Sequence, residues 1–429
     1  MSTIDTTNGS WRLNRDQRGA FISALVGWVF DYYEVFLLTM LVVPISAELG
    51  LSTGQVAAIF SVQLLFMAIG GVAFGYLADR LGRRDVLMWT IIIYCVFTVA
   101  RGFVPDYTTL LIFTALAALG IGGEYGVGQT LVAELVPRNR RGWWSGLLYG
   151  GIYVGIMLAA LVGGQVTPHI GWRWTFVLSG IPILAAIYVR KVSPESEVWV
   201  NERRMGGKPD LSLLRRKVFL VPFLMCLAAG SMQFFGYYGI TTFLPTYLAG
   251  EGFDAAKASW WLFFTGVAGM VGCLVGSYTS DRWGRRPTLS FLAGTAAVSG
   301  LILFLTWDSL LTSAWIMIPF FFLYFGSNGA TVFGALFSEM FPTELRSTGV
   351  SSALQVARGL TAIPPLLTAW MLPRWGYEAV VLLGAGWFLL LALYAWAFKE
   401  TRGISVAAVT TKPHAATATH PVDRTAPVE

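Results

Sequence analysis

Long apolar segments, separated by short polar or charged ones, follow one another along almost the whole chain of 429 residues. Twelve of these segments reach the length of roughly 20 residues that an α-helix needs to cross the hydrocarbon core of a bilayer. We expect these helices at residues 19–45, 55–79, 86–104, 108–135, 143–165, 172–191, 218–248, 257–280, 287–306, 310–340, 348–371 and 377–398. The pattern therefore predicts an all-α membrane protein with twelve transmembrane helices.

The composition agrees with this prediction and narrows the chemistry. Hydrophobic residues make up 55% of the chain and charged residues 13%, and the mean hydropathy is +0.62. The three cysteines, Cys95, Cys226 and Cys273, lie inside apolar segments at spacings that fit neither a metal site nor a disulfide framework. We therefore expect no metal and no cofactor. The first apolar segment is too long for the core of a signal peptide, so we expect it to remain as a span.

The basic residues predict the orientation, because Lys and Arg are held on the cytoplasmic side during insertion. With both termini in the cytoplasm, 25 of the 30 Lys and Arg residues fall on that side. Four fall outside, namely Arg101, Arg173, Lys257 and Arg374, and Arg358 lies about 11 residues into the eleventh span. The net charge of +6 is thus a topology signal that requires no nucleic-acid partner.

A longer charged stretch between the sixth and seventh spans divides the chain. The predicted parts are an N-terminal cytoplasmic segment at 1–18, a bundle at 19–191, a cytoplasmic linker at 192–217, a bundle at 218–398 and a tail at 399–429. The tail is rich in Ala, Thr and Pro and has few large apolar side chains, so we expect it to be disordered.

The two halves repeat each other. GYLADRLGRR at 75–84 and SYTSDRWGRR at 277–286 agree at six of ten positions, and AELVPRNRR at 133–141 corresponds to SEMFPTELR at 338–346. Such parallel repeats predict two pseudo-symmetric six-helix bundles related by an axis along the membrane normal. They also predict a site near the midplane, where the halves meet, and alternating access by rocking.

Over about residues 15–403 the chain resembles the major facilitator superfamily of transporters. GYLADRLGRR is similar to the signature loop of that family, and PESEVW and KETRG resemble the sequences that close each half in its sugar-porter-like branch. The resemblance implies ion pairs that latch one conformational state. The latch residues are Asp79, Arg83, Glu134 and Arg141, with the counterparts Asp281, Arg285, Glu339 and Arg346. Alternatively, these charges only fix the orientation of the chain.

Three carboxylates lie deep in predicted spans. Asp31 and Glu34 are three residues apart and so share a helix face near mid-membrane, and Glu124 lies at a similar depth in the fourth span. A charged residue there costs about 2.5–3.5 kcal/mol, so such residues usually mark an ion or substrate path. Burial favours the neutral form of a carboxyl group, which indicates proton-coupling residues. Alternatively, one or more of these acids is a permanently paired structural residue.

Arg358 is the deep cation of the second half, and its planar fork matches a carboxylate, so it favours an anionic substrate. The alternative is an internal pair with Asp31, Glu34 or Glu124. Further candidates for substrate binding offer hydroxyl or amide groups near the midplane. They are Tyr32, Tyr237, Gln233, Asn328 and Gln355.

The short elements FDYYE and GGEYG resemble those of proton symporters for organic acids, in the sialate and lactate branch. The resemblance implies symport of a small organic monocarboxylate with a proton in the inner membrane of a bacterium. A sugar or polyol symporter, a drug:proton antiporter and a membrane sensor without turnover stay open as alternatives. The oligomeric state also stays open, and a monomer would suffice.

An enzyme is not expected, because the histidines lie outside the predicted spans and no Walker sequence is present. The histidines are His169, His414 and His420.

Overall fold

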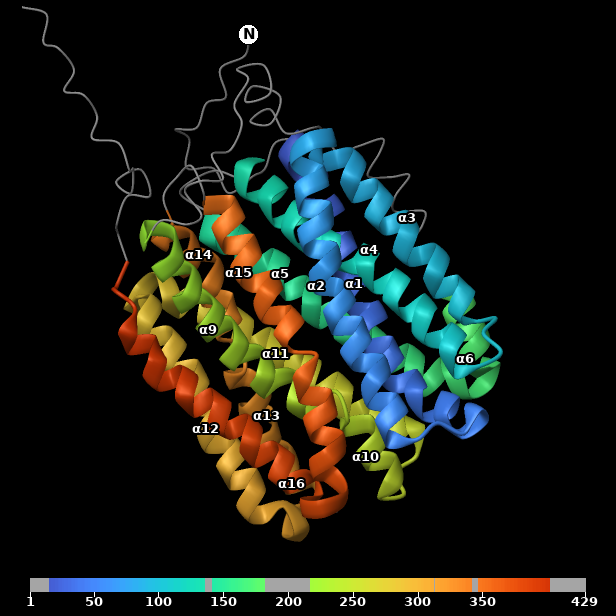
Figure 1. Cartoon of the computed structure of the whole chain (residues 1–429). Coiled ribbons are helices and arrows are strands. Elements are labelled where there is room, and N and C mark those ends of the chain that lie inside the picture. Colours follow the sequence, from blue (N-terminus) through green and yellow to red (C-terminus); the bar gives the residue numbers. More distant parts are fainter. Residues whose placement is uncertain (1–14, 136–140, 182–216, 312, 342–345, 402–429) are drawn as a thin grey trace, which may run out of the picture.

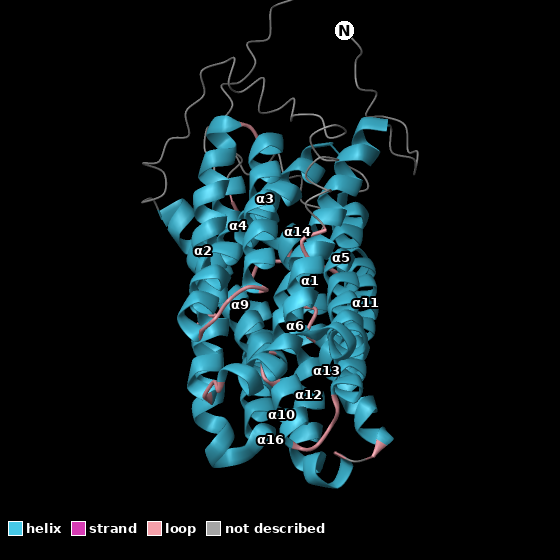
Figure 2. Cartoon of the chain, turned by 90° about the vertical axis from the view of Figure 1, so that its right-hand side faces the viewer, coloured by secondary structure: helices cyan, strands magenta, loops and turns pink. Residues whose placement is uncertain are grey.

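The computed structural model describes residues 15–135, 141–181, 217–311, 313–341 and 346–401. Within these ranges all regular structure is helical. Figure 1 shows the first half of the chain, in blue to green, beside the second half, in yellow to red. The helices run along a common direction and are joined by short loops at the two ends (Figure 2).

In the described part of the first half there are six helices and one π-helical turn. They are α1 (Arg15–Leu49), α2 (Thr53–Leu81), α3 (Arg83–Arg101), α4 (Tyr107–Leu135), α5 (Arg141–Leu161), η2 (Val162–Val166) and α6 (Thr167–Leu178). The described part of the second half is divided into more pieces, several of them short. They are α9 (Lys217–Thr241), α10 (Leu244–Gly250), α11 (Ala255–Trp283), α12 (Arg285–Leu310), η4 (Ala314–Ile316), α13 (Met317–Gly326), α14 (Ala330–Met340), α15 (Arg346–Leu360), α16 (Ile363–Tyr394) and η6 (Ala395–Ala397).

Eight helical stretches of the described chain are long and apolar enough to cross a membrane. One of them, Ser352–Ala397, has 46 residues, which is about 69 Å of helix and more than twice the hydrocarbon core. It turns at Gly376 and covers two predicted spans, while the stretch Gly146–Leu178 turns at Gly171 and covers the fifth predicted span and the first residues of the sixth. Together with α3 and α4, these stretches correspond to the twelve predicted segments, the sixth of which is described only as far as residue 181.

Glycines at the turns have equivalent backbone conformations in the two halves, so the internal repeat is also visible in the structure. Each described residue with positive φ is a glycine, and the six form three pairs, which are Gly50 with Gly252, Gly82 with Gly284, and Gly171 with Gly376. Members of a pair are 202 or 205 positions apart, as in the sequence repeat. Positive φ is strained for residues with a Cβ atom, so glycine is needed there. We call the end with Gly82 and Gly284 the latch end and the opposite end the far end.

Exposed aromatic side chains mark both ends of the bundle. Tyr76, Trp89, Tyr278, Trp283 and Trp396 lie toward the latch end, each more than half exposed. Trp174, Trp260, Trp315, Trp370 and Trp375 lie toward the far end. Between these belts the outer surface is aliphatic and aromatic, with many exposed Leu, Ile, Val and Phe side chains. Two aromatic belts around an apolar band are typical of a protein that spans a bilayer.

Helices α2 and α4 pack closely because glycines let their backbones approach. A Cβ atom on Gly70 would lie 2.0 Å from the carbonyl oxygen of Leu119, and one on Gly122 would lie 1.8 Å from that of Met67. Moving either backbone aside would cost free energy in a closely packed interior, so larger residues are excluded at both positions.

We expect Gly70→Ala to destabilise the protein by about 1–3 kcal/mol, because the added methyl group overpacks the contact between α2 and α4. Gly75→Ala is the matched control on the same helix, since a Cβ atom there meets nothing within 4 Å. Thermal unfolding of the purified variants in detergent measures the difference. An unfolding temperature for Gly70→Ala equal to that of Gly75→Ala would contradict this account.

Three spans that the sequence predicts as continuous are broken in the second half. The break between α9 and α10 lies at 242–243, that between α13 and α14 at 327–329, and that between α15 and α16 at 361–362. Prolines in the first turns of α10 and α16, including Pro245 and Pro364, start a new helix because they lack the N–H group that a continuous helix needs. The predictions of unbroken helices at 218–248, 310–340 and 348–371 are therefore wrong in this detail.

The two halves meet along several helix pairs. Helix α5 packs against α11, α2 against α15 and α16, and α1 against α10. The contact of α5 with α11 depends on a small residue, because a Cβ atom on Gly269 would lie 2.1 Å from a ring carbon of Tyr153. This interface encloses some of the residues that the sequence predicts as functional, among them Asp31, Tyr32 and Arg358.

Candidate substrate and proton site

A small cavity lies between the two halves and holds charges of opposite sign. Its walls come from α1, α2, α4 and α15, and in this state their side chains pack so closely that no space the size of a water molecule remains between them. The lining residues are Trp28, Asp31, Tyr32, Val35, Met67, Ile121 and Arg358. Asp31 and Arg358 are each only 3% exposed, so the cavity is closed toward both ends in this state.

Arg358 is held in place from both halves. Its Nη2 atom donates a hydrogen bond to the hydroxyl oxygen of Tyr32 at 3.1 Å, and its guanidinium carbon lies 5.8 Å from the ring centre of Phe234. The residue is in the last turn of α15, where the helix dipole favours a cation. The break at 361–362 ends α15 next to the cavity, which is why this favourable helix end is available there.

Aromatic contacts between the halves close the cavity toward the far end. The ring centres of Phe60 and Phe243 are 6.0 Å apart, and those of Phe36 and Tyr237 are 6.3 Å apart. The hydroxyl of Ser61 on α2 donates to the carbonyl oxygen of Ala362, at the break after α15, at 2.7 Å. These aromatic rings, or the helix ends at the break after α15, would have to move before the cavity could open on this side.

Gln355 closes the cavity toward the latch end. Its amide lies in a slot formed by glycines of α2 and α4, and a Cβ atom on Gly71 would lie 2.4 Å from the amide nitrogen. That nitrogen donates to the carbonyl oxygen of Gly122 at 3.3 Å. Gln355 precedes Arg358 by about one helical turn, so the predicted substrate ligand acts in this state as a plug on the latch side of the cavity.

Two other predicted substrate ligands brace the break between α13 and α14. Gln233 donates from Nε2 to the carbonyl oxygen of Ser327 at 2.6 Å. Asn328 accepts a hydrogen bond at Oδ1 from the hydroxyl of Tyr153 on α5, across the interface. Both amides lie outside the lining of the small cavity in this state.

Tyr237 belongs to a group of tyrosines near the centre of the interface. It is close enough to Tyr32, Tyr153 and Tyr324 for electrostatic interaction, and its ring packs edge-on against that of Tyr324 at 6.1 Å. Unlike its neighbours it is partly exposed. The structure thus brings Tyr32 and Tyr237, which occupy equivalent positions of the repeat, together between the halves.

Glu34 has a partner that the sequence did not predict. Arg101, expected at the outer surface, is fully buried at the end of α3 and forms an ion pair with Glu34 on α1. The two residues are 67 positions apart, so no local pattern could have revealed the contact. This pairing favours the structural alternative for Glu34 that the sequence left open.

Three of the four second-half latch residues, Asp281, Arg285 and Glu339, meet at the latch end. Arg285 forms ion pairs with Asp281 at 2.7 Å and with Glu339 at 3.3 Å. Glu400 accepts hydrogen bonds from the backbone N–H groups of Arg285 and Arg286 at 2.9 and 3.1 Å. A carboxylate is favourable at this N-terminus of α12, so Glu400 ties the end of the last helix to the turn at Gly284.

The remaining predicted site residues lie on helical backbone, but their side chains fall outside the described part of the structure. They are Glu124, Asp79, Arg83, Glu134, Arg141 and Arg346.

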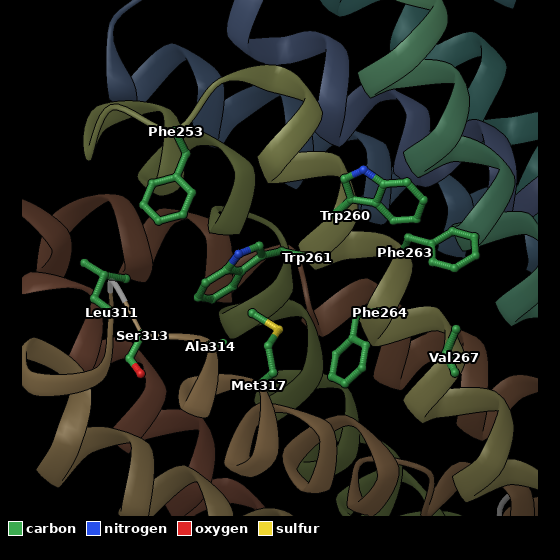
Figure 3. A pocket seen from close by; sticks show the side chains of 10 residues that line it. All are labelled: Phe253, Trp260, Trp261, Phe263, Phe264, Val267, Leu311, Ser313, Ala314 and Met317. Carbon is green, nitrogen blue, oxygen red and sulfur yellow. The ribbon is translucent and has the colours of Figure 1, made fainter.

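A larger pocket lies elsewhere, between α11, α13 and η4 toward the far end, with about 1000 Å³ of empty space (Figure 3). Its lining residues are Phe253, Trp260, Trp261, Phe263, Phe264, Val267, Leu311, Ser313, Ala314 and Met317. None of them carries a charge, and Trp260 is 54% exposed within the far aromatic belt. The lining suits hydrocarbon and offers no counter-charge to an organic anion, so the small cavity is the candidate site.

A bundle of helices long and apolar enough to cross a membrane, with a charged cavity closed between its halves, is typical of a membrane transporter. The chain belongs to the major facilitator superfamily, because the sequence profile of the Major Facilitator Superfamily matches residues 19–364. The predicted fold of twelve transmembrane helices in two pseudo-symmetric bundles is thereby confirmed.

Two of the similar proteins are named as transporters of organic acids, and one solved structure shows the same fold. A cis,cis-muconate transport protein of Acinetobacter baylyi is 31% identical over 398 residues, 89% of this chain and 94% of that protein. The sialic acid transporter NanX of Escherichia coli is 29% identical over 377 residues, 83% of this chain and 88% of that protein. The crystal structure of a D-xylose-proton symporter has a TM-score of 0.72 and 20% identity, covering 90% of this chain and 99% of that one. At this identity the last similarity shows the fold alone.

Proposed function

We propose that the protein is a proton-coupled symporter that carries a small organic monocarboxylate across the inner membrane of a bacterium by alternating access. The observation that carries this proposal is the placement of Asp31 and Arg358 in one cavity, on opposite halves of the bundle. Among the described residues that line it Arg358 is the one arginine, so it suits one carboxylate. The names of the muconate and sialic acid relatives support an organic acid as cargo.

Coupling follows from a competition for Arg358. A buried guanidinium needs a counter-charge, and removing its partner is strongly destabilising. Asp31 supplies that charge when the cavity holds no substrate. A substrate carboxylate can replace it, and Asp31 is then free to take up a proton because burial favours the neutral form of an acid. The loaded cavity holds the same net charge as the empty one, so both can be enclosed by the moving halves.

The proton also makes uptake of an anion favourable. Moving one negative charge inward against 100 mV costs about 2.3 kcal/mol, and one accompanying proton cancels that cost. The pH gradient then drives accumulation. In this proposal the latch end and both termini face the cytoplasm, and the latch residues stabilise one of the two states.

The bundles at 19–191 and 218–398 rock about the cavity. When the latch side opens, Gln355 leaves its slot beside Gly71, and substrate exchanges with the cytoplasm.

Uptake into proteoliposomes tests the proposal. We expect the purified native chain to accumulate at least one radiolabelled monocarboxylate from a panel when the vesicle interior is more alkaline than the medium. Accumulation is expected to stop when a protonophore abolishes the gradient. Vesicles without protein are the control. Accumulation of a neutral sugar or polyol, with no competition by any carboxylate, would overturn the proposal and reassign Arg358 to an internal ion pair.

A further inference from the structure

The ion pair of Glu34 and Arg101 is isolated from the cavity. Both side chains are at most 2% exposed. The Nη2 atom of Arg101 donates to the carboxylate of Glu34 and also to the hydroxyl oxygen of Thr98, at 3.1 Å. The ring of Phe176 lies over the guanidinium group, whose carbon is 4.9 Å from the ring centre. Neither member of the pair lines the cavity that holds Asp31 and Arg358.

Few other charges face this pair. On the packed elements α4, α5, η2 and α10, the described side chains include no charged residue. Helix α3 adds Arg84 and Asp85 at its latch end, and α6 adds His169 and Arg173 toward the far end. On its own helix Glu34 lies next to Tyr33, whose hydroxyl bonds to Ser179 at 2.6 Å, and one turn from Asp31. Arg101 is thus the cation that balances Glu34.

We infer that Arg101 is a positioning residue that keeps Glu34 ionised throughout the cycle, so that Asp31, of the two acids on α1, carries the coupled proton. This inference rests on the proposed function and assigns different roles to two acids that lie one helical turn apart.

The physical reason is the lack of a replacement partner. Protonating Glu34 would leave the Arg101 guanidinium charged and uncompensated in a buried site. The Nε and Nη1 atoms of Arg101 have no hydrogen-bond partner among the described residues, so no second acceptor there would offset the loss. Substrate cannot take the place of Glu34 because Arg101 is fully buried and outside the cavity.

Asp31 differs from Glu34 because a replacement for its charge is available. Its cavity contains Arg358, whose counter-charge a substrate carboxylate can supply. Of the two acids on α1, Asp31 is therefore the one that can exchange its charge for that of the cargo.

Infrared difference spectroscopy of the protein in liposomes tests the assignment without requiring transport. Between mildly acidic and alkaline pH we expect one buried carboxyl group to titrate in the native chain. Asp31→Asn should remove this signal. The charge-neutral double variant Glu34→Gln/Arg101→Gln should keep it, as should the matched control Glu48→Gln/Arg173→Gln, which removes an exposed ion pair of 2.8 Å at the far end.

The single variant Arg101→Gln should gain a second protonated carboxyl signal, which the added Glu34→Gln substitution removes. Arg101→Lys keeps the charge and should restore the single signal. Loss of the titrating group in the double variant, with its retention in Asp31→Asn, would overturn the inference. If that pattern appears while a monocarboxylate still accumulates, only the assignment of the proton fails; if no carboxylate accumulates, the proposed function fails by itself.

Discussion

Replacing Arg358 with Gln is expected to lower the affinity for the carboxylate substrate more than any other single change in the cavity. Truncating one partner of a buried, hydrogen-bonded charge pair costs about 2–5 kcal/mol. This range corresponds to a loss of affinity of about 30-fold to several-thousand-fold. Tryptophan fluorescence offers a direct measurement of the dissociation constant, because Trp28 lines the same cavity.

Two controls separate recognition from loss of charge. Arg358→Lys keeps the charge but not the planar fork, so we expect an affinity between those of the native chain and Arg358→Gln. Arg374→Gln changes an exposed arginine at the far end, which donates to the carbonyl oxygen of Trp370 at 2.6 Å, and should leave binding unchanged. Native affinity in Arg358→Gln, with the protein folded, would mean that this arginine serves the bundle and not the substrate.

The twelve spans were predictable because each depends on local information. About 20 apolar residues in a row satisfy their own backbone hydrogen bonds as a helix, whatever their neighbours do. The repeat was visible for a similar reason. Gly82 and Gly284 occupy turns that need positive φ, so the requirement appears at one position in each half and marks the sequence directly.

The breaks in the second half were not predictable from hydropathy. Ser327, Asn328 and Gly329 interrupt the tenth span, and two of their acceptor oxygens are satisfied by donors from other helices. Gln233 on α9 donates to Ser327, and Tyr153 on α5 donates to Asn328. A window of sequence contains neither donor, so the segment is read as continuous helix.

Depth alone also did not separate the two acids of α1. Asp31 and Glu34 have the same distance from the helix ends to within a turn, and both are buried. Their difference comes from partners on other helices, since α3 brings Arg101 to one and α15 brings Arg358 toward the other. Sequence therefore predicts where buried charge lies, while the tertiary contacts decide which charge faces the cavity.

Asp31→Asn is expected to separate substrate binding from accumulation. The amide has nearly the shape of the acid but cannot ionise, so it neither competes for Arg358 nor carries a proton. The variant should bind the carboxylate at neutral pH at least as tightly as the native chain does, and it should still exchange labelled for unlabelled substrate. Uptake against a concentration gradient should be lost, because the imposed pH gradient no longer acts on the loaded state.

The pH dependence of substrate affinity should show in which direction protonation of Asp31 changes binding. In the native chain substrate binding requires protonated Asp31, so above the pH at which this acid ionises the affinity should fall by about tenfold per pH unit. In Asp31→Asn that slope should vanish over the same range, leaving the affinity flat where the native chain weakens. Dissociation constants from Trp28 fluorescence across that range, with Arg374→Gln as a control that keeps the slope, decide the matter. An unchanged slope in Asp31→Asn would assign the coupled proton to another group and remove the competition for Arg358 from the mechanism.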